Sequence, residues 1–296
     1  KFRFFLNSMR DSVLKIITEK FKDDIDIYLL LGDLGVFQAR FAHEFDSYRC
    51  INYGIMEQSM LGFASGISKA GSYPIVYSIA PFIVERSFEQ LKLDFGYNKS
   101  KGLIITAGGS FDYNKLGPTH YCPNDVSLIS TTNCSYIYLP WNTSDANESI
   151  KQVLTEKNYT YFRLSSENIE GKDKPPDLLI NYEKDDKNNI SIGLGPDSVF
   201  LAEFLGLKLD YSLQSITPKS ISFLSDLISN GKNLTILAGF NIDFLPGNIK
   251  SCNIISSNDS KKTTLTIHYS SESQYDTAES KQKHLTSSIK SLDILI

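Results

Sequence analysis

The amino-acid sequence predicts an α/β protein of two domains, each built on a mostly parallel sheet flanked by helices. The chain has 296 residues, a length that fits two domains of ordinary size. Short apolar runs alternate with helical patterns along residues 1–165, and the alternation resumes after residue 190. Near-continuous apolar strands spaced by helices are typical of a parallel sheet covered on both faces.

The first domain is expected at residues 1–166, and local patterns define its elements. Apolar residues at helical spacing after a possible Ser8 cap predict the first helix, and Gly71 is expected to end a later helix in a left-handed conformation. Short runs of Ile, Leu, Val and Tyr predict the strands. In chain order the expected elements are helix 8–21, strand 25–31, extended run 49–53, helix 56–70, strand 74–79, helix 83–95, strand 102–107, a helix near 124–131, strand 135–139, helix 145–156 and strand 159–164.

A linker is predicted at residues 167–189, because 11 of these 23 residues are charged and two adjacent prolines lie among them. Beyond it the sequence predicts a second, smaller domain at residues 190–296. Its expected elements are strand 190–194, helix 197–207, strand 211–216, helix 219–229, strand 233–239, a strand near 263–269 and a helix near 276–291.

The composition argues against several classes of function. The 30 Lys and Arg residues face 34 Asp and Glu residues, and the net charge of −4 gives no support for binding nucleic acid or an anionic membrane. No stretch approaches the ~20 apolar residues of a membrane span. The first apolar run is too short for a signal peptide, and the four cysteines lack metal-like spacing. A soluble, cytoplasmic chain with free thiols is therefore expected.

The most informative stretch is residues 49–66, where Glu57 stands at the point at which an extended run turns into a helix rich in small residues. Two effects on this carboxylate oppose each other. A helix N-terminus stabilises the anion by about 0.3–1 kcal/mol, whereas burial among apolar neighbours disfavours it. An ordinary acid in the first turn of a helix is the alternative interpretation of Glu57 taken alone.

The run Asn-Tyr-Gly-Ile-Met-Glu-Gln at 52–58 resembles the cofactor-activating motif of the transketolase-like thiamine diphosphate enzymes. Gly-Pro-Thr-His at 117–120 resembles a second motif of this family, and residues 78–90 resemble the segment that lines its pyrimidine pocket. The resemblance covers residues 7–165 through these ordered motifs, and residues 190–296 by architecture alone. It implies a pyrimidine-binding domain followed by a transketolase-type C-terminal domain.

The resemblance also implies roles for single residues. Glu57 would hydrogen-bond the cofactor's pyrimidine ring and share a proton with it, and His120 would face the reacting carbons of the substrate. Phe82 and Phe88 match two of three aromatic positions in the pyrimidine pocket, although plain core packing is the alternative for both. Asp33 falls where the family has an acid near the thiazolium, although a common strand-end turn explains it equally well.

Other positions depart from the family pattern. The departures are Glu85 for the middle aromatic, Leu116 for an acid, Gly108 for a histidine and Ser166 for an arginine. Arg10 matches an arginine that helps to hold the sugar phosphate, and Arg163 lies near the expected position of another, so both are predicted to contact the substrate. Losing cationic and imidazole donors weakens a phosphate clamp. An unphosphorylated acceptor, or one held elsewhere, is therefore expected.

The chain lacks the family's Gly-Asp-Gly…Asn motif, which binds the diphosphate through Mg²⁺, and no metal ligand is predicted here. The resemblance then implies a split enzyme, an α2β2 heterotetramer in which a second subunit holds Mg²⁺ and the diphosphate end of thiamine diphosphate. The expected reaction transfers a two-carbon ketol unit from a ketose to an aldehyde, with small sugars as substrates. Three alternatives stay open: a 2-oxoacid dehydrogenase β-type subunit, a 1-deoxyxylulose-5-phosphate synthase relative, and a non-catalytic subunit that kept the fold.

Overall fold

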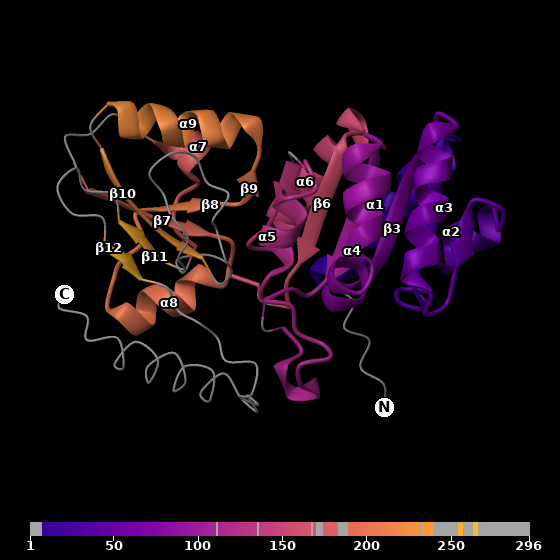
Figure 1. Cartoon of the computed structure of the whole chain (residues 1–296), viewed down its shortest axis with the longest axis horizontal. Coiled ribbons are helices and arrows are strands. Elements are labelled where there is room, and N and C mark those ends of the chain that lie inside the picture. Colours follow the sequence, from indigo (N-terminus) through magenta and orange to yellow (C-terminus); the bar gives the residue numbers. More distant parts are fainter. Residues whose placement is uncertain are drawn as a thin grey trace.

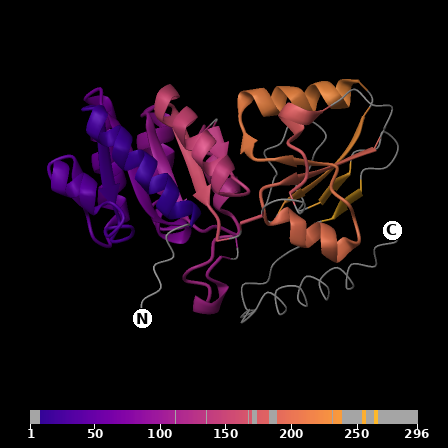
Figure 2. The same ribbon diagram turned by 180° about the vertical axis from the view of Figure 1, so that it is seen from behind.

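Two β-sheets lie side by side in the protein (Figures 1 and 2). The seven-stranded sheet has the order β2-β1-β3-β4-β6-β5-β9, and the five-stranded sheet has the order β12-β11-β10-β7-β8. We call the parts built on them the first lobe and the second lobe. The structure, a computed structural model, describes residues 8–110, 112–134, 136–166, 168–169, 174–182, 189–230, 232–238, 254–256 and 263–265.

Six strands of the first sheet run parallel, which confirms the predicted fold class. Because the strands are parallel, their carboxyl ends meet at the same edge of the sheet. β9 pairs antiparallel with β5, with Ile216 opposite Ile137. The strand bounds are β1 Ile27–Leu31, β2 Cys50–Asn52, β3 Tyr73–Ile79, β4 Gly102–Ala107, β5 Tyr136–Tyr138, β6 Tyr159–Leu164 and β9 Ser215–Ile216.

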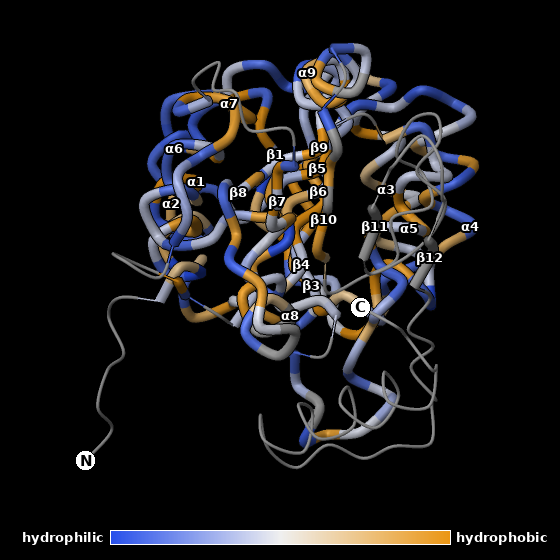
Figure 3. The backbone as a smooth tube through the Cα atoms, turned by 90° about the vertical axis from the view of Figure 1, so that its left-hand side faces the viewer, coloured by the Kyte–Doolittle hydropathy of each residue, from blue (hydrophilic) through white to orange (hydrophobic). Residues whose placement is uncertain are grey.

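Helices cover both faces of the first sheet (Figure 3). α1 and α6 lie on one face, where Val13 and Ile150 belong to the same buried apolar cluster. α3 and α5 lie on the other face, where Met60 and Val126 share a second cluster. The bounds are α1 Met9–Asp23, α2 Arg40–Phe45, α3 Glu57–Lys69, α5 Asp125–Ser130 and α6 Thr143–Glu156. α2 had no counterpart among the sequence-based predictions.

The predicted helix 83–95 is interrupted. Two π-helical segments, η1 (Pro81–Glu85) and η2 (Leu91–Tyr97), flank the single turn α4 (Phe88–Gln90). The chain passes very close to a neighbouring backbone here, because a Cβ atom on Gly96 would lie 2.4 Å from the Thr132 carbonyl oxygen. Tight packing of this kind overrides the α-helical pattern of the sequence.

In the second lobe, the predicted strand 211–216 forms two short strands that belong to different sheets. β8 (Tyr211–Leu213) pairs with β7, and β9 crosses to the first sheet. The second lobe's other elements are β7 Asn189–Leu194, α8 Ser198–Leu205, α9 Pro218–Ser229, β10 Asn233–Ala238, β11 Ile254–Ser256 and β12 Thr263–Leu265. The helix predicted near 276–291 lies outside the described residues.

The segment predicted as a linker contains the short helix α7 (Leu178–Asn181). Leu178 is fully buried, and Asp177 forms an isolated parallel bridge with Ser212 of β8. This part of the segment therefore packs on the second lobe.

Within the part of the chain that the structure describes, no helix combines the length and the apolar character that crossing a membrane requires. Cys50, Cys122 and Cys134 are buried free thiols. Cys252 lies outside the described residues.

Candidate active site

Glu57 is the first residue of α3, at the edge where the parallel strands of the first sheet end. Only 1% of its surface is exposed. The Ser78 hydroxyl, from the carboxyl end of β3, donates to Glu57 Oε1 at 3.1 Å, and Arg86 Nη1 donates to Oε2 at 2.9 Å. A buried carboxylate of this kind requires partners. Both come from the 78–90 segment, whose resemblance to the lining of a pyrimidine pocket was noted from the sequence, although neither residue was assigned a role there.

Arg86 connects Glu57 with Phe82, another residue that the sequence predicts for the site, and Phe82 leads on to His120. Its guanidinium carbon lies 4.2 Å from the centre of the Phe82 ring, which is a cation–π contact. The Phe82 ring in turn meets the His120 ring edge to face, with centroids 5.4 Å apart. The structure therefore brings Glu57, Phe82 and His120 into one chain of contacts, in which the 42% exposed side chain of Arg86 links Glu57 to Phe82.

The side chains of Phe88 and Asp33 form no hydrogen bond, ion pair or ring contact with these four residues in the part of the chain that the structure describes. Phe88 begins α4 and is half-buried, but the ring contacts of the described residues join Phe82 to His120 without it. Asp33 follows β1 with a left-handed φ of 54°. Its N–H donates to Asn52 Oδ1 at 3.0 Å, and Asn52 Nδ2 donates to Asp33 Oδ1 at 3.1 Å. Asn52, which opens the motif of Glu57, thus holds the turn of Asp33.

His120 lies in a long connection between β4 and α5, and we call its described residues, 108–110 and 112–123, the His120 loop. Its Nδ1 lies 2.8 Å from the Thr119 hydroxyl oxygen. Asp112 holds the loop to the end of β6, because its Oδ2 accepts from the Ser165 hydroxyl at 3.1 Å and from the Ser166 N–H at 3.2 Å. Ser166, which stands where the family pattern has an arginine, therefore helps to hold the loop through Asp112.

Glu85, which stands where the family pattern has an aromatic residue, also faces this loop. Desolvation raises the pKa of the Glu85 carboxyl, and a hydrogen bond with the Cys122 side chain opposes part of that rise.

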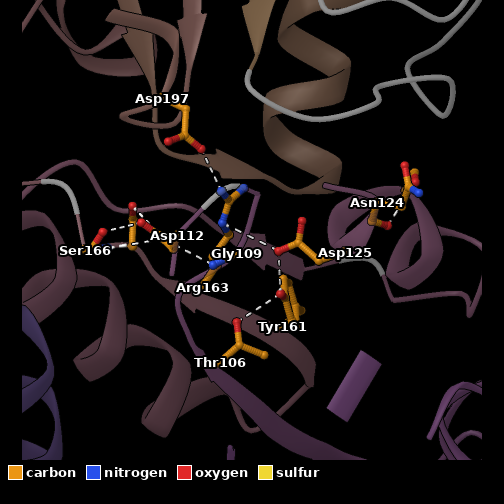
Figure 4. A network of polar contacts seen from close by, with 11 residues as sticks. Thr106, Gly109, Asp112, Asn124, Asp125, Tyr161, Arg163, Ser166 and Asp197 are labelled. Atoms are coloured by element: carbon orange, nitrogen blue, oxygen red, sulfur yellow. Dashed lines mark hydrogen bonds and ion pairs between the residues drawn. The ribbon is translucent and has the colours of Figure 1, made fainter. Parts of the chain in front are cut away.

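The two arginines predicted to contact substrate differ in their surroundings. Arg10 of α1 lies 5.4 Å from the centre of the Tyr113 ring in the His120 loop. Arg163 of β6 is only 3% exposed and forms ion pairs with Asp197 at 2.6 Å and with Asp125 at 3.5 Å (Figure 4). The position of Arg163 inside the protein does not support the predicted contact with substrate.

The surroundings of Arg163 are strongly charged. Asp112, Asp125 and Asp197 are all at most 7% exposed. Burial raises the pKa of Asp125, although the Arg163 guanidinium and a hydrogen bond from Tyr161 act against this rise. Burial alone would lower the pKa of Arg163, but the three carboxylates raise it overall. Sequence reasoning missed this cluster because its members lie far apart along the chain.

Gly109 allows a stability test of the same cluster. A Cβ atom on Gly109 would lie 2.1 Å from Arg163 Nε and 2.5 Å from Asp125 Oδ2. We expect Gly109→Ala to lower the free energy of unfolding by about 1–3 kcal/mol, because overpacking displaces the ion pair. Urea unfolding measures this change. The matched control is Gly66→Ala in α3, where the added methyl meets open space and should be neutral or stabilising; equal losses in both variants would contradict the prediction.

Within the described ranges, no group of three or more His, Cys, Asp or Glu side chains is arranged to hold a metal ion.

Comparisons with known proteins identify the family and the fold of the chain. A family model described as the transketolase pyrimidine-binding domain matches residues 7–172. The chain is 26% identical over 182 residues to one subunit of the apulose-4-phosphate transketolase of Actinobacillus succinogenes, a match that covers 60% of this chain and 57% of the relative. It is 32% identical over 139 residues to an uncharacterized 33.6 kDa protein in the fasciation locus of Rhodococcoides fascians, covering 47% of this chain and 45% of the relative.

The matches thus span about half the length of these two relatives. Among solved structures, a split gene transketolase described as an inactive beta4 tetramer superposes with a TM-score of 0.60. The two chains share 19% sequence identity, and the superposition covers 78% of this chain and 79% of the transketolase chain. This likeness shows the fold. Because the family model covers more than half of the residues, the chain belongs to the family of the transketolase pyrimidine-binding domain.

Proposed function

We propose that this chain supplies the pyrimidine-facing half of a thiamine diphosphate site. Together with a separate diphosphate-binding subunit, it transfers a two-carbon ketol unit from a ketose to an aldehyde. The observation that carries the proposal is the buried Glu57 carboxylate, whose partner Arg86 reaches Phe82 and, beyond it, His120. Membership of the family and the similarity to a subunit of an apulose-4-phosphate transketolase support the reaction type.

The contacts of the Arg86 guanidinium indicate what kind of group Glu57 and Phe82 can hold between them. A flat, nitrogen-bearing guanidinium donates to Glu57 and lies over the Phe82 ring. An aminopyrimidine ring shares these features, since it is flat, carries nitrogens that can hydrogen-bond a carboxyl group, and stacks on aromatic faces. Glu57 and Phe82 therefore fit the pyrimidine end of the cofactor. We infer that the Arg86 side chain, which is 42% exposed, turns outward to make room.

Each residue then has a distinct role. Glu57 would hold the pyrimidine ring through a hydrogen bond in which the carboxyl group shares a proton, and the Ser78 hydroxyl fixes the orientation of that carboxyl group. Phe82 would offer its face to the ring. When bound, thiamine diphosphate supplies the electron sink that cleavage of a carbon–carbon bond needs. His120 takes and returns a proton at the substrate hydroxyl, and Thr119 holds its Nδ1.

We further propose that Asp33 lies near the thiazolium, at the edge where β1 ends. Arg10 remains a proposed substrate contact, through its position against Tyr113 of the His120 loop.

The proposed partner carries Mg²⁺ and the diphosphate end. Large apolar side chains next to Glu57 support such a partner, because Ile55, Met56 and Phe63 are 68%, 56% and 44% exposed. Apolar exposure around an otherwise buried carboxylate is typical of a protein interface. We propose an α2β2 heterotetramer, in which this surface and the partner enclose the cofactor.

His120 gives a first test of the chemistry. We expect His120→Gln to lower kcat/KM of the assembled enzyme by about 10²-fold, because glutamine keeps a polar side chain but cannot carry the proton. Steady-state transfer with a ketose donor and an aldehyde acceptor measures this. His43→Gln is the control, since His43 is an exposed residue of α2 whose Nδ1 lies 2.8 Å from the Cys50 carbonyl oxygen. Unchanged kcat/KM in His120→Gln would remove His120 from the mechanism.

Isothermal titration tests the split site itself. The chain alone should bind thiamine diphosphate and Mg²⁺ weakly, whereas its complex with a subunit carrying Gly-Asp-Gly…Asn should bind them tightly. Tight binding by the chain alone would refute the division of the site.

The same complex separates the related activities, because a ketol-transferring enzyme accepts hydroxypyruvate as donor in preference to simple 2-oxoacids.

A further inference from the structure

Arg163 joins the two lobes (Figure 4). It lies on β6 of the first sheet, and its Nη2 donates to Asp197 Oδ2 at 2.6 Å. Asp197 directly precedes α8 of the second lobe. Its Nε lies 3.5 Å from Asp125 Oδ2. Asp125 is the first residue of α5 and follows the His120 loop. One guanidinium therefore contacts the second lobe and the end of the loop that carries His120.

The two ends of the His120 loop pair with each other, and the first end lies against this guanidinium. At the first end, the Gly109 backbone lies so close that a Cβ atom would be 2.1 Å from Arg163 Nε. At the other end, the Cys122 N–H donates to the Ser110 carbonyl at 2.8 Å, and the two residues form an antiparallel bridge. Since His120 precedes Cys122 by two residues, a displacement of Arg163 would move the base of the loop and His120 with it.

We propose that Arg163 is a positioning residue through which the second lobe sets the place of His120. This inference rests on the proposed function, because it gives the second lobe a role in that same site. Arg163 is enclosed by carboxylates and almost fully buried, so it acts by holding the loop and does not touch the substrate. The contact with Asp197 keeps the guanidinium oriented toward Asp125 and Gly109.

Asp197 offers a clean way to break this coupling. It is 6% exposed and occupies the N-cap position of α8, but its side chain makes no capping hydrogen bond. Asp197→Ala therefore removes the contact with Arg163 without removing a helix cap. Asp197→Asn is the second variant, which keeps the shape and loses the charge, in case the alanine variant does not fold.

Hydrogen exchange on the full chain tests the coupling without any assumption about activity. We expect Asp197→Ala to speed amide exchange in the His120 loop at least about 10-fold and to speed alkylation of Cys122, which is fully buried in the parent chain. The matched control is Lys174→Ala, which removes one partner of another largely buried ion pair, with Asp145 at 2.6 Å. Faster exchange confined to the second lobe, or equal changes in the control, would overturn the proposal.

Activity of the complex with the diphosphate-binding subunit gives a second readout. Asp197→Ala should lower kcat/KM about 10-fold in the parent enzyme but cause no further loss in the His120→Gln background, because both changes act through one side chain. The apparent Kd of thiamine diphosphate should change less than twofold. Equal losses in both backgrounds would show a general structural effect and refute the inference. A parent complex without transfer activity would refute the proposed function alone, since the exchange experiment still decides the coupling.

Discussion

Replacing Glu57 by glutamine is expected to lower two-carbon transfer by the assembled enzyme at least about 10³-fold, within the range of general acid–base catalysis. Glutamine has nearly the same shape and can still accept from Ser78, but it cannot share a proton with the cofactor ring. Every later step depends on that activation, so the loss should exceed the loss in His120→Gln. The measurement is kcat with saturating cofactor.

The control for this variant is Glu89→Gln, an exposed acid on α4 in the same segment of the chain. It should keep activity within about twofold, as substitutions at exposed positions usually do. The Glu57 variant should also unfold at a urea concentration close to that of the parent chain, which shows that the fold is intact. Retention of more than a tenth of the activity in Glu57→Gln would exclude the proposed role.

Replacing Trp141 by alanine is expected to lower the free energy of unfolding by about 3–5 kcal/mol. Trp141 follows the first lobe's β5 but is fully buried in a cluster with Ala202, Leu209 and Leu237 of the second lobe. Its Nε1 donates to the Leu213 carbonyl at 3.3 Å, so the substitution leaves a cavity and removes one hydrogen bond from a carbonyl that also accepts from the Gly195 N–H at 3.1 Å.

Urea unfolding followed by circular dichroism measures this loss. Trp141→Phe should cost clearly less, because it keeps most of the apolar volume and loses only the N–H donor. Tyr48→Ala is the surface control, since Tyr48 is 88% exposed and should change stability by less than about 0.5 kcal/mol. A Trp141→Ala loss below about 1 kcal/mol would show that the junction of the lobes contributes little.

The alternation of strands and helices predicted the parallel sheet, whereas the resemblance to a known family implied that three site residues belong together, and the fold gives a physical reason for their grouping. Parallel strands end at a common edge, and motifs that follow different strands therefore converge there. Glu57 follows β2, Phe82 follows β3 and His120 lies in the loop after β4. In the structure Arg86 links Glu57 to Phe82, and the Phe82 ring meets the His120 ring.

Sequence reasoning missed the contacts that depend on long-range packing. Arg86 lies inside the segment assigned to the pyrimidine pocket, but its pairing with Glu57 depends on how η1 packs against α3. Arg163 was predicted as a substrate contact, and its burial between Asp125 and Asp197 became visible only with both lobes in place. The crossing of β9 to the first sheet was missed as well, because the pattern of residues 211–216 is that of one strand.

The central claim is that Glu57 activates the cofactor, and exchange of the hydrogen at C2 of the thiazolium with deuterated solvent tests it most directly. The complex of this chain with the diphosphate-binding subunit should exchange this hydrogen at least about 100-fold faster than free thiamine diphosphate. The Glu57→Gln complex, with cofactor bound, should exchange it at nearly the rate of the free cofactor. Equal rates in the parent and Glu57→Gln complexes would contradict the account.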